Sequence, residues 1–129
     1  MKTIAKVIKI TRFRRWTLAC ALFLALQSSA WAHAFLDHAD PKVGSTVTGS
    51  PKQVRLWFTQ ELEPAFSSIE VDNAEGKQVD AKDCRVDAKD KSLLEVSLPP
   101  LPPGTYTVSW RVVSTDTHRT QGHFEFTIQ

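Results

Sequence analysis

Apolar and polar residues alternate in several short segments of the chain. In residues 53–59, Val54, Leu56 and Phe58 occupy every second position. Side chains two residues apart on an extended strand project from the same face, so this spacing predicts a β-strand with one buried face. The same alternation recurs in four further segments, whose inward-facing sets are Ile69 and Val71; Leu94, Val96 and Leu98; Tyr106, Val108, Trp110 and Val112; and Phe124, Phe126 and Ile128.

Turn-forming residues separate these segments. Residues 73–76 read Asn-Ala-Glu-Gly, and residues 99–104 carry four prolines and a glycine, a composition that disfavours a helix. No segment shows a sustained helical period. The pattern therefore predicts an all-β sandwich or barrel of about seven strands. The turn from Pro103 to Tyr106 also resembles the tyrosine corner of immunoglobulin-like sandwiches.

The start of the chain has a different pattern. Six cations and no acid precede residue 16, residues 16–26 form an apolar run, and residues 27–32 end in Ala-Trp-Ala. A basic segment, a short apolar run and an Ala-x-Ala ending predict a secretory signal cleaved after Ala32. The run is too short for a membrane anchor, Arg14-Arg15 fits a twin-arginine signal poorly, and Cys20 lies too early for lipoprotein cleavage. We expect a signal peptide in residues 1–32 and one domain in residues 33–129.

Removal of the signal reverses the sign of the net charge. Lys plus Arg falls from 16 to 10 while Asp plus Glu stays at 14, so +2 becomes −4. An acidic domain has no electrostatic basis for binding nucleic acid. Cys84 becomes the single cysteine and no methionine remains. Because one thiol cannot form an internal disulfide, we expect Cys84 to be a small, partly buried residue between strands.

Cleavage after Ala32 also creates a candidate metal ligand. His33 becomes the first residue, and its α-amine and imidazole Nδ1 can close a six-membered chelate ring. Asp116 and His118 are two residues apart and would share a face in extended backbone. Each piece alone is common. Together they supply three nitrogens and one oxygen, which suits tetragonal Cu(II), and we expect one ion per chain.

Residues 33–129 resemble the CopC/PcoC family of periplasmic copper-resistance proteins along nearly their whole length. The run from Trp110 to His118 is the most specific part. Further matches are His33-Ala34-x-Leu36, Pro41 with Gly44, Val54-x-Leu56-x-Phe58, Leu101-Pro102-Pro103-Gly104-Thr105-Tyr106, Gly122 and Phe126. The resemblance implies a cupredoxin-like Greek-key β-sandwich that binds Cu(II) through His33, Asp116 and His118. It also implies a periplasmic location and an inner-membrane CopD-type copper transporter as a partner.

Some positions depart from the family or stay outside this site. Some members have a methionine-rich Cu(I) site, and its absence here predicts a protein for Cu(II) only. Where some relatives place a carboxylate near the metal, this chain has Gln60 followed by Glu61. We expect His38 to be exposed in a turn before Pro41, and His123 to point outward. Finally, Trp57 and Trp110 are expected to be packing residues, and Arg111 and Arg119 either brace Asp116 or are solvated.

Three functions remain to be compared. The first is a monomeric, non-enzymatic protein that sequesters or delivers Cu(II). The second is a histidine-brace copper monooxygenase, which is disfavoured because Asp116 would fill the coordination position that oxygen needs and because the domain is small. The third is a metal-free immunoglobulin-like interaction module, in which the histidines are incidental.

Overall fold

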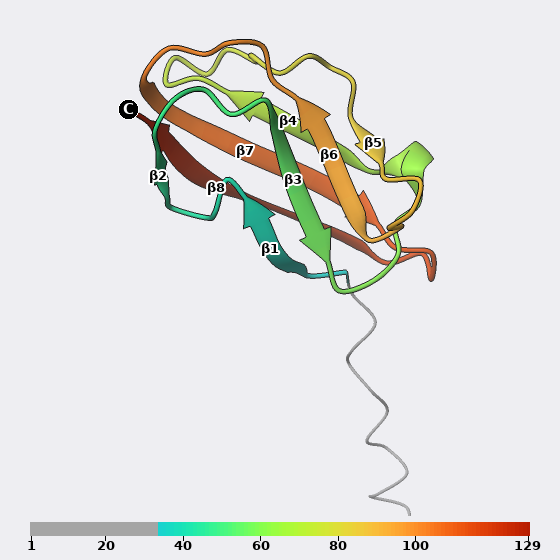
Figure 1. Cartoon of the computed structure of the whole chain (residues 1–129). Coiled ribbons are helices and arrows are strands. Elements are labelled where there is room, and N and C mark those ends of the chain that lie inside the picture. Colours follow the sequence, from blue (N-terminus) through green and yellow to red (C-terminus); the bar gives the residue numbers. More distant parts are fainter. Residues whose placement is uncertain (1–33) are drawn as a thin grey trace, which may run out of the picture. The chain divides into compact units, whose positions relative to one another are not determined.

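Eight β-strands form two sheets in residues 34–129, the part of the chain that the computed structural model describes (Figure 1). The predicted signal peptide, Cys20 and His33 lie outside the described residues. In strand order, the first sheet contains β1 (Leu36–Asp40), β3 (Gln53–Phe58), β6 (Leu93–Ser97) and β5 (Arg85–Val86). The second contains β2 (Thr46–Val47), β8 (Arg119–Ile128), β7 (Gly104–Val113) and β4 (Ser68–Asp72). A short 3-10 helix, η1, covers Pro64–Phe66.

The chain changes sheet repeatedly, since its first four strands alternate between the two layers. All pairs are antiparallel except β2 with β8, and β7 and β8 pair over ten positions. The predicted all-β sandwich is confirmed. Eight strands agree with the expected number of about seven, although β2 and β5, with two residues each, are too short to show an alternating pattern. No helix among the described residues is long and apolar enough to cross a membrane.

The core lies between the two sheets and is built from the alternating positions. Along β3, partly buried and buried residues alternate without a break, and β4 follows the same order for Ile69 and Val71. All the apolar sets that were expected to face inward are buried, apart from Trp110, which is partly buried and packs against the core. Burying each such side chain contributes about 1.5–3 kcal/mol before entropy is counted, so these faces hold the sheets together.

Two aromatic residues of β7, Tyr106 and Trp110, make specific contacts with this core. Tyr106 is 3% exposed, and its hydroxyl donates a hydrogen bond to the carbonyl of Pro102 at 2.6 Å, which confirms the tyrosine corner. Further along β7, Trp110 lies opposite Gly122 of β8. A Cβ at Gly122 would lie 2.7 Å from Cη2 of Trp110, so glycine leaves room for the indole. Trp110 also contacts the rings of Phe58 and Phe124, as expected of a packing residue.

Candidate metal centre

The loop between β7 and β8 brings Asp116 and His118 together at one end of the sandwich (Figure 1). Oδ2 of Asp116 lies 3.2 Å from Nδ1 of His118. The extended backbone expected here was wrong. Instead, the amides of Thr117 and Ser114 donate to the carbonyls of Ser114 and His118, and Thr117 has φ of +72°. The tight turn, and not strand periodicity, therefore makes the two side chains converge.

Ser114 orients the carboxylate of Asp116 through a hydrogen bond. Its side chain is 0% exposed, and its hydroxyl donates to Oδ1 of Asp116 while lying 3.3 Å from the carbonyl of His118. The Ser114 hydrogen bond, followed by the interactions with His118, lowers the pKa of Asp116 below its ordinary value. Within residues 34–129, the contacts of Asp116 come from Ser114 and His118, and not from Arg111 or Arg119. Arg111 and Arg119 are both exposed, which agrees with the solvated alternative.

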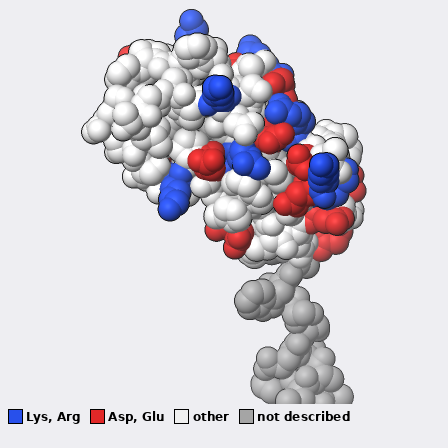
Figure 2. Space-filling model, viewed as in Figure 1, with Lys and Arg blue, Asp and Glu red and all other residues white. Residues whose placement is uncertain are grey.

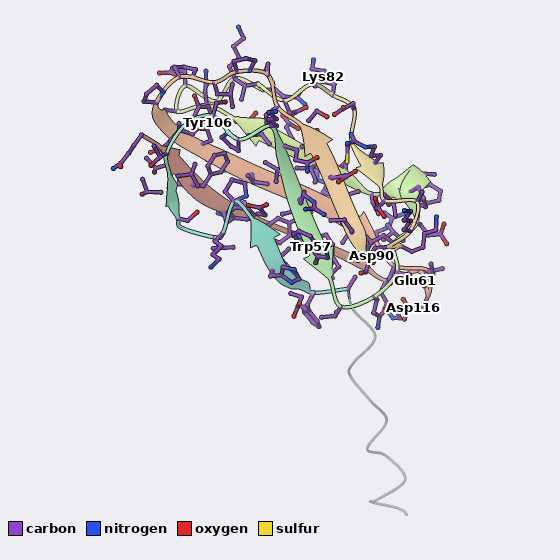
Figure 3. All side chains as sticks on the ribbon, viewed as in Figure 1. Trp57, Glu61, Lys82, Asp90, Tyr106 and Asp116 are labelled. Atoms are coloured by element: carbon purple, nitrogen blue, oxygen red, sulfur yellow. The ribbon has the colours of Figure 1, made fainter. Side chains whose placement is uncertain are left out.

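The segment after β3 lies against this loop through its backbone. The amide of Thr115 donates to the carbonyl of Glu61 at 3.0 Å, Leu62 bridges to Ser114, and the amide of Glu63 donates to Val113. Figure 3 shows Glu61, Asp90 and Asp116 at the same end of the domain, opposite Tyr106. The sequence did not predict that the carbonyl of Glu61 accepts this hydrogen bond, because the bond joins two segments that are distant along the chain.

The first described residues are held beside the same loop. Ala34 is fully buried, and its carbonyl accepts a hydrogen bond from Oγ1 of Thr120 at 2.6 Å. The amide of Phe35 donates to Oγ1 of Thr59, whose own amide donates back to the carbonyl of Phe35. Ala34 and Phe35 therefore lie between the end of β3 and the start of β8. Their contact on β8 is Thr120, two residues beyond His118 in the chain.

Acidic side chains gather near this end of the domain. In Figure 2, Asp and Glu concentrate toward the part that carries the β7–β8 loop, whereas Lys and Arg are more widely spread over the visible face. This distribution favours a cation over an anion as a ligand. Among the described residues, however, no group of three or more His, Cys, Asp or Glu side chains is arranged to hold a metal ion. A complete site thus needs a donor besides Asp116 and His118.

The remaining candidate residues lie elsewhere. His38 is exposed as expected, but its placement in a turn was wrong, since it belongs to β1 and stacks on Trp57. His123 is exposed on β8, as predicted. Cys84 is partly buried and packs against the core, and its sulfur accepts a hydrogen bond from the amide of Ile69. Its structural role is confirmed.

Comparison with known proteins assigns the family. The CopC domain model matches residues 36–129, nearly all of the described part. The chain belongs to the CopC family. Among solved CopC-family structures, CopC from Methylosinus trichosporium OB3b is 38% identical, has a TM-score of 0.71, and the match covers 75% of this chain and 94% of that one. PcoC, a methionine-rich copper resistance protein from Escherichia coli, is 32% identical with a TM-score of 0.68 and coverage of 76% and 100%.

A CopC-like segment also occurs within a longer protein. The copper transport protein CutJ of Bacillus subtilis is 31% identical over 116 residues, and the match covers 88% of this chain but 21% of CutJ. In CutJ, a segment similar to this chain is thus joined to a much larger polypeptide.

Proposed function

We propose that this CopC-family chain is an exported copper-binding protein whose mature form holds one Cu(II) ion. Its ligands are the α-amine and imidazole of His33 with Asp116 and His118. The observation that carries the proposal is the hydrogen bond between Thr120 and the carbonyl of Ala34, because it holds the residue next to His33 beside the β7–β8 loop. Consecutive Cα atoms are about 3.8 Å apart, so the position of Ala34 supports the proposal that the donors of His33 reach that loop.

The donor set accounts for the choice of metal. A free α-amine and an imidazole on one residue chelate a metal ion, and Asp116 and His118 add one oxygen and one nitrogen from a preformed turn. Nitrogen and oxygen donors suit Cu(II), whereas Cu(I) selects soft sulfur ligands. Residues 33–129 contain no methionine, and the one thiol hydrogen-bonds to Ile69 within the fold. We therefore assign Cu(II) and no Cu(I) site.

The predicted signal and the relatives support the proposed biological role. A signal peptide in residues 1–32, cleaved after Ala32, directs the protein to the periplasm and exposes the amine of His33. There the protein sequesters Cu(II) or passes it on as a monomer, without catalysing a reaction. CutJ, in which a similar segment belongs to a copper transport protein, supports a membrane copper transporter of the CopD type as the partner.

Copper titration of the periplasmic protein tests this proposal. Intact mass should show that the chain begins at His33, and EPR during addition of CuCl2 should show a tetragonal, nitrogen-rich signal that saturates first at one equivalent. A variant with one glycine inserted before His33 should lose most of this affinity, because its amine leaves the chelate ring. The His123→Asn variant is the matched control and should bind normally.

Two outcomes would favour the other functions. A titration without a tight equivalent, or equal affinity after the glycine insertion, would contradict the His33 site and favour a metal-free interaction module. Oxygen-dependent cleavage of chitin or cellulose by the copper-loaded protein would favour a histidine-brace monooxygenase.

A further inference from the structure

A second histidine, far from the β7–β8 loop in sequence, has the surroundings typical of a metal ligand. His38 lies on the outer face of the β1–β3–β6–β5 sheet, where it contacts Asp37 and Trp57. We propose that Asp37 and His38 form a second, weaker Cu(II) site, in which Nε2 of His38 binds the ion and the other coordination positions stay open to solvent. This site does not depend on His33.

A β-bulge places the two side chains together. In the β1–β3 pair, Leu36 lies opposite Phe58 and His38 lies opposite Trp57, so Asp37 is an extra residue without a partner of its own. A bulge redirects side chains that would otherwise alternate between the faces of a sheet. Here Oδ2 of Asp37 approaches Nδ1 of His38 to 2.8 Å.

This contact determines which imidazole nitrogen is available. A carboxylate oxygen can only accept a hydrogen bond, so in the neutral ring this 2.8 Å contact favours the tautomer with the proton on Nδ1, which leaves the Nε2 lone pair for a metal ion. Metal-binding histidines in proteins commonly donate their other N–H to a carboxylate, which orients the ring and makes it more basic. The His38 side chain is 58% exposed, so a dissolved ion can reach Nε2.

Trp57 holds the imidazole in place. The two rings stack with centroids 4.3 Å apart and planes inclined by 13°. The guanidinium of Arg55 lies 4.6 Å from the centre of the same indole, and Arg55 also faces Glu95 on β6. Because the ring of His38 is already fixed by Asp37 and Trp57, binding an ion costs it little side-chain freedom. His123, which is also exposed, has no such carboxylate among its described contacts.

The open coordination suggests a role in exchange. Imidazole is a good ligand for Cu(II), but one imidazole without a chelating amine binds more weakly than the proposed His33 site. An ion bound to His38 has open coordination positions, and a ligand from a copper-donating or copper-accepting protein can bind there. The Asp37–His38 site is thus suited to take up copper or release it in contact with another protein.

Nuclear magnetic resonance of the periplasmic protein tests the site, because Cu(II) is paramagnetic and broadens signals near it. With ¹⁵N-labelled protein, CuCl2 added beyond the first equivalent should broaden the indole N–H signal of Trp57, identified with the Trp57→Phe variant. His38→Asn should abolish this broadening, and Asp37→Asn should shift it to about 10- to 100-fold higher copper concentration. His123→Asn should leave it unchanged.

The glycine insertion before His33 separates this site from the main one. In that variant, the indole N–H signal of Trp57 should still broaden. If the His33 site is lost, this broadening should begin with the first copper added. Broadening of Trp57 that persists in His38→Asn, or that disappears equally in His123→Asn, would overturn the proposal. So would a Trp57 signal that stays sharp at millimolar copper. Because His38 and Asp37 are exposed, circular dichroism should show unchanged folding in both variants.

Discussion

Ser114 organises the β7–β8 loop from inside the sandwich. Its hydroxyl donates to the carboxylate of Asp116, and its amide donates to the carbonyl of His118. The same side chain is fully buried, so no water competes for these bonds. One residue that is not itself a proposed ligand thus orients both residues that are.

Replacing Ser114 by alanine should loosen the site without removing a ligand. We expect the Ser114→Ala variant to bind Cu(II) about 10- to 100-fold more weakly, the usual cost of losing a group that orients a metal ligand. Thr115→Ala is the matched control, because that side chain is exposed and the loop contact of Thr115 uses its backbone amide. Competition titration with a copper chelator measures both, and equal affinities would contradict this role of Ser114.

The same variant changes the titration of Asp116. Because the Ser114 hydrogen bond lowers the pKa of Asp116, that pKa should rise toward the ordinary value in Ser114→Ala. A lowered folded-state pKa contributes stability above the unfolded value of about 3.9, and this contribution is lost as the pH falls through the folded value. NMR titration of the copper-free protein from pH 6 downward should therefore give the higher midpoint for the variant.

At the scale of single elements, edge strand β4 is covered by the segment that follows it. The amide of Val71 donates to Oδ2 of Asp80 at 2.8 Å, and that of Ile69 donates to the sulfur of Cys84 at 3.3 Å. Burial raises the pKa of the Cys84 thiol, so it stays protonated and neutral at this edge. Exposed edge strands favour pairing with other chains. Asp80 and Cys84 therefore accept hydrogen bonds from β4 amides that could otherwise pair with a strand of another chain.

Asp80→Ala should destabilise the domain and expose this edge. Asp80 is 8% exposed and also accepts a hydrogen bond from the amide of Lys82. Loss of its carboxylate leaves these backbone donors unpaired, which costs about 1–3 kcal/mol of the free energy of unfolding. Urea unfolding measures the stability, and light scattering measures association. Glu70→Ala, on the exposed positions of β4, is the control and should change neither. A variant as stable and as monomeric as the parent would contradict the protective role.

On the scale of the whole molecule, the proposed copper site joins the two sheets. His33 precedes β1 of the first sheet, whereas Asp116 and His118 lie between β7 and β8 of the second. An ion bound to all three would cross-link residues that are more than 80 positions apart in the chain, in addition to the hydrogen bond from Thr120 to Ala34, which spans 86. A ligand that binds only the folded state raises the free energy of unfolding.

Copper should therefore raise the melting temperature of the mature protein. At free Cu(II) one hundred times the dissociation constant, the gain is about 2.7 kcal/mol, or roughly 10–20 °C for a domain of this size. Calorimetry with CuCl2, and again after EDTA, measures the shift and its reversal. The variant with a glycine before His33 should gain much less at the same copper concentration. An equal shift in that variant would show that the stabilisation does not involve the amine.

Local periodicity was enough to predict the strands that carry the core, because a buried face forces apolar residues to alternate. It was not enough for β2 and β5, which are too short, or for His38, whose strand has an exposed face and a bulge. The pairing of Asp116 with His118 was predicted for the wrong reason, since a turn with Thr117 at positive φ produces it.

By itself, the sequence determined the all-β class, the inward faces of the strands and the motifs that mark the CopC family, since each depends on residues close together in the chain. Only the tertiary structure decided which segments meet. It brought Ala34 to Thr120, Glu61 to Thr115 and Asp80 to Val71. These contacts depend on how two sheets close over one core, and no local pattern of residues encodes that.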